Sequence, residues 1–281
     1  MMAIVRTKCA WNELLAILPS CLRTEVDRHQ NTLQEIRLRR NKPVVLVCQK
    51  NKMELLRQTT LEDLQYVLNS ACRYSPWTAA TTAQGFVTAP GGHRVGLCGE
   101  AVVRNGVMNG IGTVSSLNIR VARDFPGISG NLWLRKENIL ILGPPGSGKT
   151  TLLRDLIRQR AQQENVAVVD ERGEIFPISA DFPTGLNTDV VNGCSKPQGI
   201  ELVLRAMSPD CIAVDEITAG EDCYAMVQAG WCGVLLVATA HASSAADLRS
   251  RAFYTPLVSS GLFNTAVVLR KDKSWYTERI T

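Results

Sequence analysis

Residues 143–150 read Gly-Pro-Pro-Gly-Ser-Gly-Lys-Thr, and the architecture of this 281-residue chain follows from them. They match the pattern G-x-x-x-x-G-K-[ST] of a phosphate-binding loop, whose glycines let the backbone aim several N–H groups at a phosphate. In such a loop the Lys149 ammonium reaches the β- and γ-phosphates, and the Thr150 hydroxyl ligates Mg²⁺. The residues expected to hold the nucleotide are Gly143, Pro144, Pro145, Gly146, Ser147, Gly148, Lys149, Thr150 and Thr151.

The segments on both sides of this loop predict a strand and a helix. Residues 138–142 form an apolar run typical of a buried strand, and residues 150–163 have the apolar spacing of an amphipathic helix. The first N–H groups of such a helix face the phosphates, because they have no partner within the helix. An ordinary Gly-Pro turn is the alternative, but it does not require these two neighbours. The chain therefore binds a nucleoside triphosphate.

The composition fits a globular protein and excludes few functions. Hydrophobic residues make up 45% of the chain and the formal net charge is +5, with the 31 basic residues spread along the sequence. This charge permits contact with nucleic acid or an anionic membrane without indicating either. The nine cysteines include no C-x-x-C pair, and we expect them to be reduced, small core residues. Because no apolar run approaches about 18 residues, we expect a soluble, cytoplasmic protein without an integral membrane segment.

We expect two domains and a linker, with boundaries at 1–125, 126–135 and 136–281. The first part predicts a smaller α+β domain, with helices at 11–18 and 61–73 and strands at 33–40, 44–49, 85–88, 93–98, 100–103 and 116–121. In the last part, apolar strands at 138–142, 166–169, 211–214 and 233–238 alternate with helical stretches. This alternation predicts an α/β fold, a RecA-like P-loop ATPase domain whose parallel sheet is covered by helices on both faces.

A pair of acids follows the apolar strand at 211–214. Asp215 would lie at the carboxyl end of this strand and ligate Mg²⁺, and Glu216 would polarise the attacking water. Carboxylates at strand ends are common, so the pair alone is a weak signal. Its position about 60 residues after a phosphate-binding loop makes it a strong one.

Two further strand ends carry polar residues. Asp170, Glu171, Arg172 and Glu174 follow one strand directly, and His241 follows the strand that ends near Thr239. In open α/β sheets, ligands bind beyond the carboxyl ends of the strands, so these residues are candidates for the same site. The alternatives are a solvated turn for residues 170–174 and a helix-capping role for His241.

Taken in sequence order, the phosphate-binding loop, the acidic segment at 170–174, the acid pair at 215–216 and His241 resemble the ATPases of type II and type IV secretion systems and the pilus motors. The chain is also similar, over nearly its whole length, to the family of stage III sporulation protein AA of spore-forming Firmicutes. The amino-terminal segments that carry this resemblance are Glu-Ile-Arg-Leu-Arg (35–39), Gly-Gly-His-Arg-Val-Gly (91–96) and Ser-Ser-Leu-Asn-Ile-Arg (115–120). The later ones are 143–154, 169–172, 207–210, 215–216 and 238–241.

The resemblance implies a hexameric ATPase in the mother-cell cytoplasm, peripheral to a membrane, that energises a channel complex across the two membranes around the forespore. It implies ATP and Mg²⁺ as cofactors, and other copies of the chain and membrane-channel proteins as partners. The catalytic glutamate of the acidic segment maps to Glu171 or Glu174. Because this register differs by a few residues, the general base stays open between these two and Glu216. His241 maps to a sensor of the γ-phosphate.

In the resembled ATPases, arginines from the amino-terminal domain or a neighbouring subunit complete the site. Arg94 and Arg120 are the best matches, with Arg123 next. An added guanidinium stabilises the transition state of phosphoryl transfer, which is the chemical reason to look for one. The alternative for Arg94 and Arg120 is an exposed arginine on a strand.

Three functions are compatible with these residues. We favour an oligomeric motor ATPase, because a linker between two domains lets the nucleotide state move one against the other. A nucleic-acid-dependent ATPase, a loader or translocase, is the alternative; the chain has no basic stripe interleaved with aromatic residues, so nucleic acid is not an expected partner. A module that binds nucleotide without turnover is the third, and Asp215 and Glu216 argue against it. No Asn/Thr-Lys-x-Asp signature for guanine is present, which favours ATP.

Overall fold

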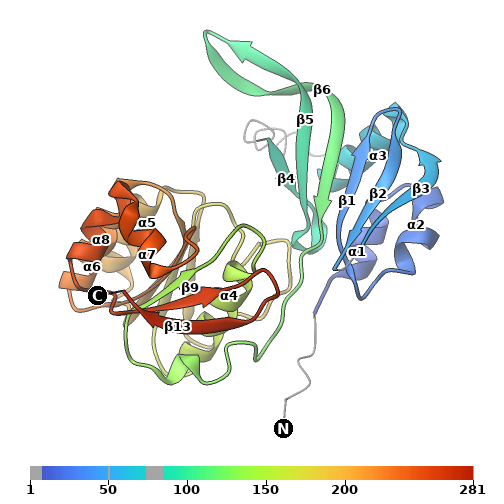
Figure 1. Ribbon diagram of the computed structural model, residues 1–281. Coiled ribbons are helices and arrows are strands. Elements are labelled where there is room, and N and C mark those ends of the chain that lie inside the picture. The colour runs from blue at the N-terminus through green and yellow to red at the C-terminus, as the bar shows by residue number, and fades with distance from the viewer. Residues whose placement is uncertain (1–7, 50, 74–84, 281) are drawn as a thin grey trace. The chain divides into compact units, whose positions relative to one another are not determined.

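The computed structural model describes residues 8–49, 51–73 and 85–280, which form two compact units (Figure 1). The amino-terminal unit comprises Lys8–Asp124 together with Pro177–Asp181. The carboxy-terminal unit comprises Phe125–Phe176 and the chain from Phe182 onward. A short piece of the second half of the sequence is thus part of the amino-terminal unit.

A seven-stranded sheet forms the centre of the carboxy-terminal unit. In spatial order its strands are β13 (Trp275–Arg279), β12 (Thr265–Leu269), β7 (Ile139–Leu142), β11 (Leu235–Ala240), β10 (Cys211–Ile217), β8 (Val166–Asp170) and β9 (Thr188–Asn192). All neighbours are parallel except β12 and β13. The predicted parallel sheet is therefore confirmed. Strand β11 begins at Leu235, two residues later than predicted, because the chain turns at Gly233 with φ +84°.

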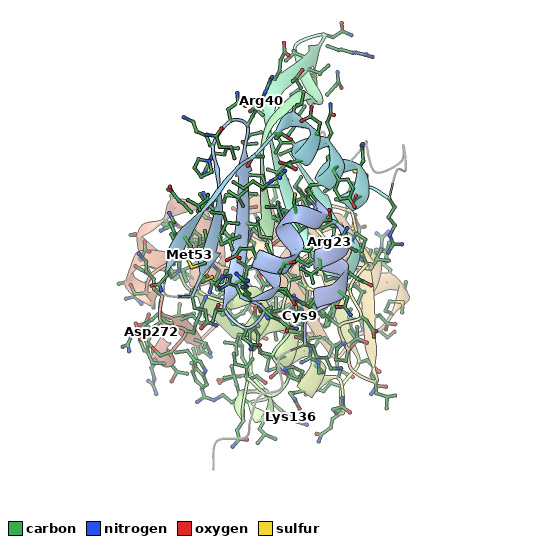
Figure 2. All side chains as sticks on the ribbon, turned by 90° about the vertical axis from the view of Figure 1, so that its right-hand side faces the viewer. Cys9, Arg23, Arg40, Met53, Lys136 and Asp272 are labelled. Carbon is green, nitrogen blue, oxygen red and sulfur yellow. The ribbon has the colours of Figure 1, made fainter. Side chains whose placement is uncertain are left out.

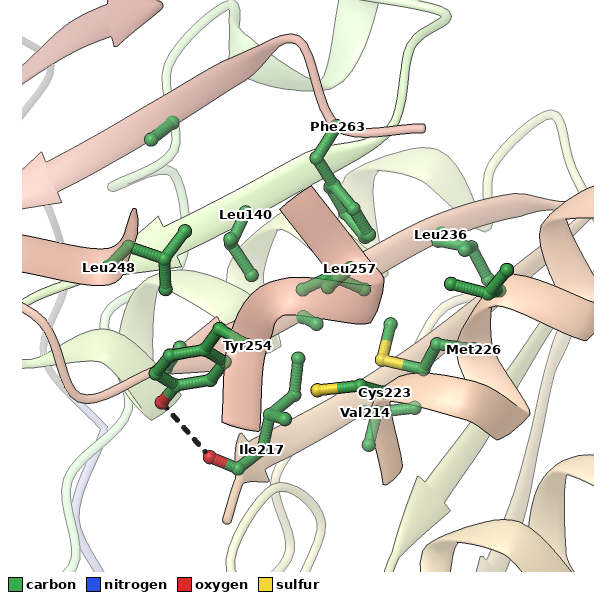
Figure 3. Packing of buried hydrophobic residues seen from close by; sticks show 14 of the residues in the cluster. Leu140, Val214, Ile217, Cys223, Met226, Leu236, Leu248, Tyr254, Leu257 and Phe263 are labelled. Carbon is green, nitrogen blue, oxygen red and sulfur yellow. Dashed lines mark hydrogen bonds between the residues drawn. The ribbon is translucent and has the colours of Figure 1, made fainter. Parts of the chain in front are cut away.

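Helices pack on both faces of this sheet, because its central strands are apolar on both faces up to the polar residues at their carboxyl ends. The helices are α4 (Lys149–Arg160), α5 (Lys196–Ala206), α6 (Gly220–Trp231), α7 (Ala245–Ser250) and α8 (Thr255–Ser259). Leu140, Val214 and Leu236 pack with α6 and α8 in one cluster, shown in Figure 3. The alternate residues, such as Ile139 and Ile141, are equally buried and face α4. Burial on both faces is typical of a parallel sheet.

The amino-terminal unit is the predicted α+β domain. Its six-stranded antiparallel sheet has the order β3 (Lys52–Gln58), β2 (Pro43–Cys48), β1 (Leu33–Arg39), β6 (Val107–Arg120), β5 (Arg94–Arg104) and β4 (Phe86–Thr88). Its helices are α1 (Trp11–Ala16), α2 (Ser20–Asp27) and α3 (Leu61–Ala71). Arg23 of α2, labelled in Figure 2, donates to the Leu18 carbonyl at 2.9 Å and to the Tyr66 hydroxyl of α3 at 3.1 Å, which ties these helices together.

The sequence patterns missed two elements of this unit and divided a third. Helix α2 buries only Leu22 and Val26, and β3 is an edge strand whose Leu56 side chain is exposed, so neither shows a strong apolar period. The strands predicted at 93–98 and 100–103 are one strand, β5. Its pairing with β6 shifts register between Cys98 and Gly99, between Gly99 and Ala101, and between Val102 and Val103, and the two strands still form one long hairpin (Figure 1).

The cysteines are less buried than expected. All nine are free, and only Cys211 and Cys223 are buried, whereas Cys21, Cys98 and Cys232 are exposed. The expectation that the cysteines are core residues is therefore wrong for most of them. Free cysteine is on average a small buried residue, but that tendency does not fix where a particular cysteine lies.

His93 and two glycines hold distant segments of the amino-terminal unit together. The His93 ring is fully buried; its Nε2 lies 3.0 Å from the Ala10 carbonyl oxygen, and its Nδ1 accepts from the Ala122 N–H at 3.1 Å. Burial lowers the pKa of His93. The N–H of Gly91 donates to the Ser179 carbonyl at 2.9 Å, which binds Pro177–Asp181 to this unit. Gly92 has φ +77°, and a Cβ there would lie 2.7 Å from the Ala180 Cβ.

The segment predicted as a linker, 126–135, is bound to α4. The Asp155 carboxylate is completely buried and accepts from the N–H of Gly127 at 2.8 Å, from the N–H and hydroxyl of Ser129 at 2.7 Å, and from Arg158 Nη1 at 2.7 Å. The segment is therefore fixed to the carboxy-terminal unit, and the change of unit falls between Asp124 and Phe125.

Candidate nucleotide-binding site

The phosphate-binding loop lies between the carboxyl end of β7 and the first turn of α4. Gly148 precedes α4 with φ +102°, a conformation that a residue with a side chain rarely adopts. Thr150 and Thr151 lie in the first turn of α4, and Pro144 and Pro145 lie in the turn before it. Within the described chain, the buried hydroxyl of Ser147 has no hydrogen-bond partner. An unpaired buried hydroxyl here fits a loop that binds phosphate oxygens.

Lys149 is folded back into its own loop. Its Nζ donates to the carbonyls of Gly143 at 2.9 Å and Pro144 at 3.2 Å, and lies 3.1 Å from His241 Nδ1. Burial lowers the pKa of Lys149, and the nearby carboxylates of Asp215 and Glu216 oppose that shift. A phosphate would replace weak carbonyl acceptors with charged ones, so the geometry favours anion binding.

Thr150 and Asp215 meet at the position expected for Mg²⁺. Thr150 Oγ1 donates to Asp215 Oδ2 at 2.7 Å, and Thr239 Oγ1 donates to Asp215 Oδ1 at 2.5 Å. Among the described residues, no group of three or more His, Cys, Asp and Glu side chains could hold a metal ion by itself. A hydroxyl and one carboxylate fit Mg²⁺, which usually binds few protein ligands and completes its shell with phosphates and water.

Glu216 and His241 form a chain of contacts that begins at Lys149. His241 Nε2 lies 2.8 Å from Glu216 Oε1, and Arg172 Nη1 donates to Glu216 Oε2 at 3.0 Å. The backbone of Glu216 has φ +53°, in the left-handed region. Residues held in that region often lie at functional sites. The structure thus brings together the lysine, the second acid and the histidine that the sequence placed in one site.

Asp170 organises the acidic segment. Its buried carboxylate accepts from the N–H groups of Glu174 at 2.8 Å, Ile175 at 2.9 Å and Phe176 at 3.0 Å. Burial raises the pKa of Asp170 to about 6, against the effect of these N–H donors. Arg154 of α4 donates to the Glu174 carbonyl at 2.9 Å. The backbone of residues 174–176 is therefore held by hydrogen bonds to Asp170, and Asp170 itself is buried and does not belong to a solvated turn.

Lys196 is a site residue that the sequence analysis missed. It begins α5, is 4% exposed, and its Nζ lies 2.5 Å from Glu171 Oε2 and 3.7 Å from Asp222 Oδ2. A lysine at the first position of a helix is unfavourable unless an acid neutralises it, and this was the available signal. A pocket in the described surface is lined by Asp170, Glu171, Arg172, Glu174, Lys196, Asp215 and Glu216.

The candidate arginines belong to the amino-terminal unit. Arg94 and Arg120 are directly opposite each other on β5 and β6; Arg120 is exposed, and the Arg94 guanidinium lies 3.8 Å from the centre of the Phe86 ring. Arg123 donates to the Leu33 carbonyl at 3.2 Å and so has a structural role within the unit. The contribution of Arg94 and Arg120 to catalysis stays a prediction. No helix in the described part of the chain is long and apolar enough to cross a membrane.

Comparison with known proteins adds a family to this geometry. The family described as "Sporulation stage III, protein AA" matches residues 8–278. Stage III sporulation protein AA of Bacillus subtilis (strain 168) is 35% identical over 284 residues, which cover 93% of this chain and 92% of that protein. Type II secretion system protein E of Pectobacterium carotovorum subsp. carotovorum is 37% identical over 114 residues, which cover 40% of this chain and 22% of that protein. The family match over residues 8–278 covers both units.

Solved structures of an ATPase and of a pilus retraction motor share the fold. The ATPase DotB of Yersinia pseudotuberculosis is 15% identical with a TM-score of 0.61, over 92% of this chain and 78% of that one. The pilus retraction motor PilT, solved with bound ADP, is 16% identical with a TM-score of 0.56, over 86% and 76% of the two chains. At these identities the likeness concerns the fold alone, and it confirms the predicted architecture.

Proposed function

The chain belongs to the family of sporulation stage III, protein AA, and from this premise we propose that it is a P-loop ATPase that energises a secretion-like channel complex during sporulation. The observation that carries the proposed activity is the contact of Thr150 Oγ1 with Asp215 Oδ2 at 2.7 Å, beside Lys149 of the phosphate-binding loop. P-loop ATPases hold Mg²⁺ with this pair of residue types.

The residues of the site have separate tasks in this proposal. Lys149 releases the carbonyls of Gly143 and Pro144 and binds the β- and γ-phosphates, together with the N–H groups at the start of α4. Thr150 and Asp215 hold Mg²⁺, which when bound neutralises the charge that develops on the phosphate oxygens. His241 Nδ1 lies 3.1 Å from Lys149 Nζ, and in this proposal His241 senses whether the γ-phosphate engages that lysine.

Glu216 is the general base that we favour. Glu216 and Glu171 each have a cationic partner, Arg172 and Lys196 respectively. What distinguishes Glu216 is its link through His241, at 2.8 Å, to the phosphate-binding lysine. Glu174 lies in the segment whose N–H groups are bound by Asp170. A base that orients water must lie near the γ-phosphate and remain ionised. Glutamine variants of the three residues separate them: the Glu216→Gln variant is expected to lose about 10²–10⁴-fold in kcat and the other two less.

The motor part of the proposal rests on how the chain connects its two units. The chain passes from the amino-terminal to the carboxy-terminal unit between Asp124 and Phe125. It then returns to the amino-terminal unit at Pro177 and leaves it again after Asp181. Pro177 follows Phe176, whose N–H is bound by Asp170 in the candidate site. A change in residues 170–176 on nucleotide turnover would therefore reach the amino-terminal unit through the backbone. We propose that a ring of subunits, a hexamer by analogy with the resembled ATPases, uses this movement at the cytoplasmic face of a membrane.

The test measures the ATP turnover rate per chain against protein concentration, with the Lys149→Ala variant as the blank. We expect Mg²⁺-dependent turnover that rises steeply with concentration and is abolished by Lys149→Ala, because neighbouring subunits complete each site. Sizing at the same concentrations shows whether assembly accompanies the rise. Folded wild-type protein that binds no ATP, or that turns over no faster than the blank, would overturn the ATPase. Turnover that needs DNA at low salt would favour a translocase instead.

A further inference from the structure

Thr239 lies beside Asp215 and Glu216 because of an irregularity in the sheet. Strands β10 and β11 pair regularly up to Val214 and Ala238 and resume at Ile217 and Ala240. Two residues of β10, Asp215 and Glu216, therefore oppose the single residue Thr239 of β11, which is a β-bulge. The bulge removes the Glu216 N–H from the ladder and accompanies its φ of +53°.

The hydroxyl of Thr239 satisfies both residues of the bulge. Thr239 is completely buried; its Oγ1 accepts from the Glu216 N–H at 2.8 Å and donates to Asp215 Oδ1 at 2.5 Å. A hydroxyl has one proton to donate and lone pairs to accept, so one side chain meets both needs. The other Asp215 oxygen, Oδ2, remains directed at Thr150 Oγ1, 2.7 Å away.

We propose that Thr239 is a positioning residue that sets both acids of the site at once. Through its donated bond it turns Asp215 Oδ2 toward Thr150 and the Mg²⁺ position. Through its accepted bond it keeps Glu216 in the left-handed conformation that presents the carboxylate to His241. The hydroxyl acts through its contacts with Asp215 and Glu216, so Thr239 is a positioning residue and not a catalytic one. The inference deepens the proposed function and rests on it for the catalytic readout only.

Three variants of Thr239 test the hydroxyl separately from the volume. Thr239→Val keeps the shape and removes the hydroxyl, Thr239→Ala removes it without crowding if valine does not fold, and Thr239→Ser restores it. Thr188→Val is the matched control, because Thr188 Oγ1 also accepts a backbone N–H, from Gly185 at 3.1 Å, on β9 of the same sheet.

The first readout does not depend on activity. Amide hydrogen exchange of a peptide that contains Glu216 is expected to accelerate at least about 10-fold in Thr239→Val and Thr239→Ala, since the Glu216 N–H loses its hydrogen bond to the Thr239 hydroxyl. Binding of fluorescently labelled ADP with and without Mg²⁺ is expected to show a smaller gain from Mg²⁺ in these variants. Thr239→Ser and Thr188→Val should behave as the wild type does.

The second readout is turnover. In Thr239→Val we expect kcat to fall about 10- to 100-fold with KM for ATP changed less than about 3-fold, the loss typical of a bond to a charged group, and Thr239→Ser to recover most of it. Wild-type exchange at Glu216 together with an unchanged Mg²⁺ effect in folded Thr239→Val would overturn the positioning role. If the wild type itself does not hydrolyse ATP, the proposed ATPase function fails. The positioning role of Thr239 is then still decided by the hydrogen exchange at Glu216 and by the effect of Mg²⁺ on ADP binding.

Discussion

Replacing Asp155 with alanine should release the segment that connects the two units from α4. The substitution removes the acceptor for the N–H groups of Gly127 and Ser129, for the Ser129 hydroxyl, and for Arg158 Nη1. Removing one partner of a buried ion pair costs about 3–5 kcal/mol, because the other charge stays buried. Arg158 keeps its bond from Nε to the Pro183 carbonyl at 2.9 Å, so we expect the lower half of that range, about 3–4 kcal/mol.

Urea unfolding and hydrogen exchange together measure this loss. Because a chain of two units need not unfold in one step, the shift of the transition midpoint is read beside the exchange of a peptide spanning 125–135. The matched control is Glu201→Ala, which removes an exposed carboxylate paired with Arg205 on α5 and should cost less than about 1 kcal/mol. A loss below about 1 kcal/mol in Asp155→Ala, with protection of 125–135 intact, would refute the reasoning.

The other predictions concern pH, the amino-terminal unit and the arginines. Burial raises the pKa of Asp170 from 3.8 to about 6, so its contribution to stability is fully present below about pH 3.8 and is lost as pH rises through 6. Relative to Asp170→Asn, the wild type should lose about 2–2.5 kcal/mol of unfolding free energy between pH 4 and 7, and a constant difference would contradict this. Gly92→Ala should destabilise the amino-terminal unit by about 1–3 kcal/mol in thermal unfolding, because the added Cβ would lie 2.7 Å from the Ala180 Cβ and the backbone φ at this position is positive. An unshifted unfolding midpoint would argue against that contact. If Arg120 completes the site of a neighbouring subunit, mixing inactive Arg120→Ala and Lys149→Ala chains should restore ATP turnover in mixed oligomers. A mixture of the two inactive variants that shows no ATP turnover would exclude this role for Arg120.

The amino-acid pattern was sufficient wherever the determining contacts are local in sequence. The phosphate-binding loop needs glycines at fixed spacing and an apolar strand before it, and β7 and α4 are found where residues 138–163 predict them. The two-sided burial of β8 and β10 followed from continuous apolar runs in the same way. Because parallel strands present their carboxyl ends at one edge, residues 170, 215 and 241 could be assigned to one site before their distances were known.

The contacts that tune this site depend on which strands and helices become neighbours, and no local pattern states that. Thr239 meets Asp215 and Glu216 only because β11 lies beside β10 and a bulge shifts their register. Lys196 meets Glu171 across 25 residues of chain, so its burial as a cation depends on the packing of α5 against β8. Likewise His93 and Pro177–Asp181 are structural parts of the amino-terminal unit because distant backbone atoms converge there. Local propensity acts over a few residues, whereas the desolvation of a charge or hydroxyl is settled by the whole fold, which alone brings its partner within reach.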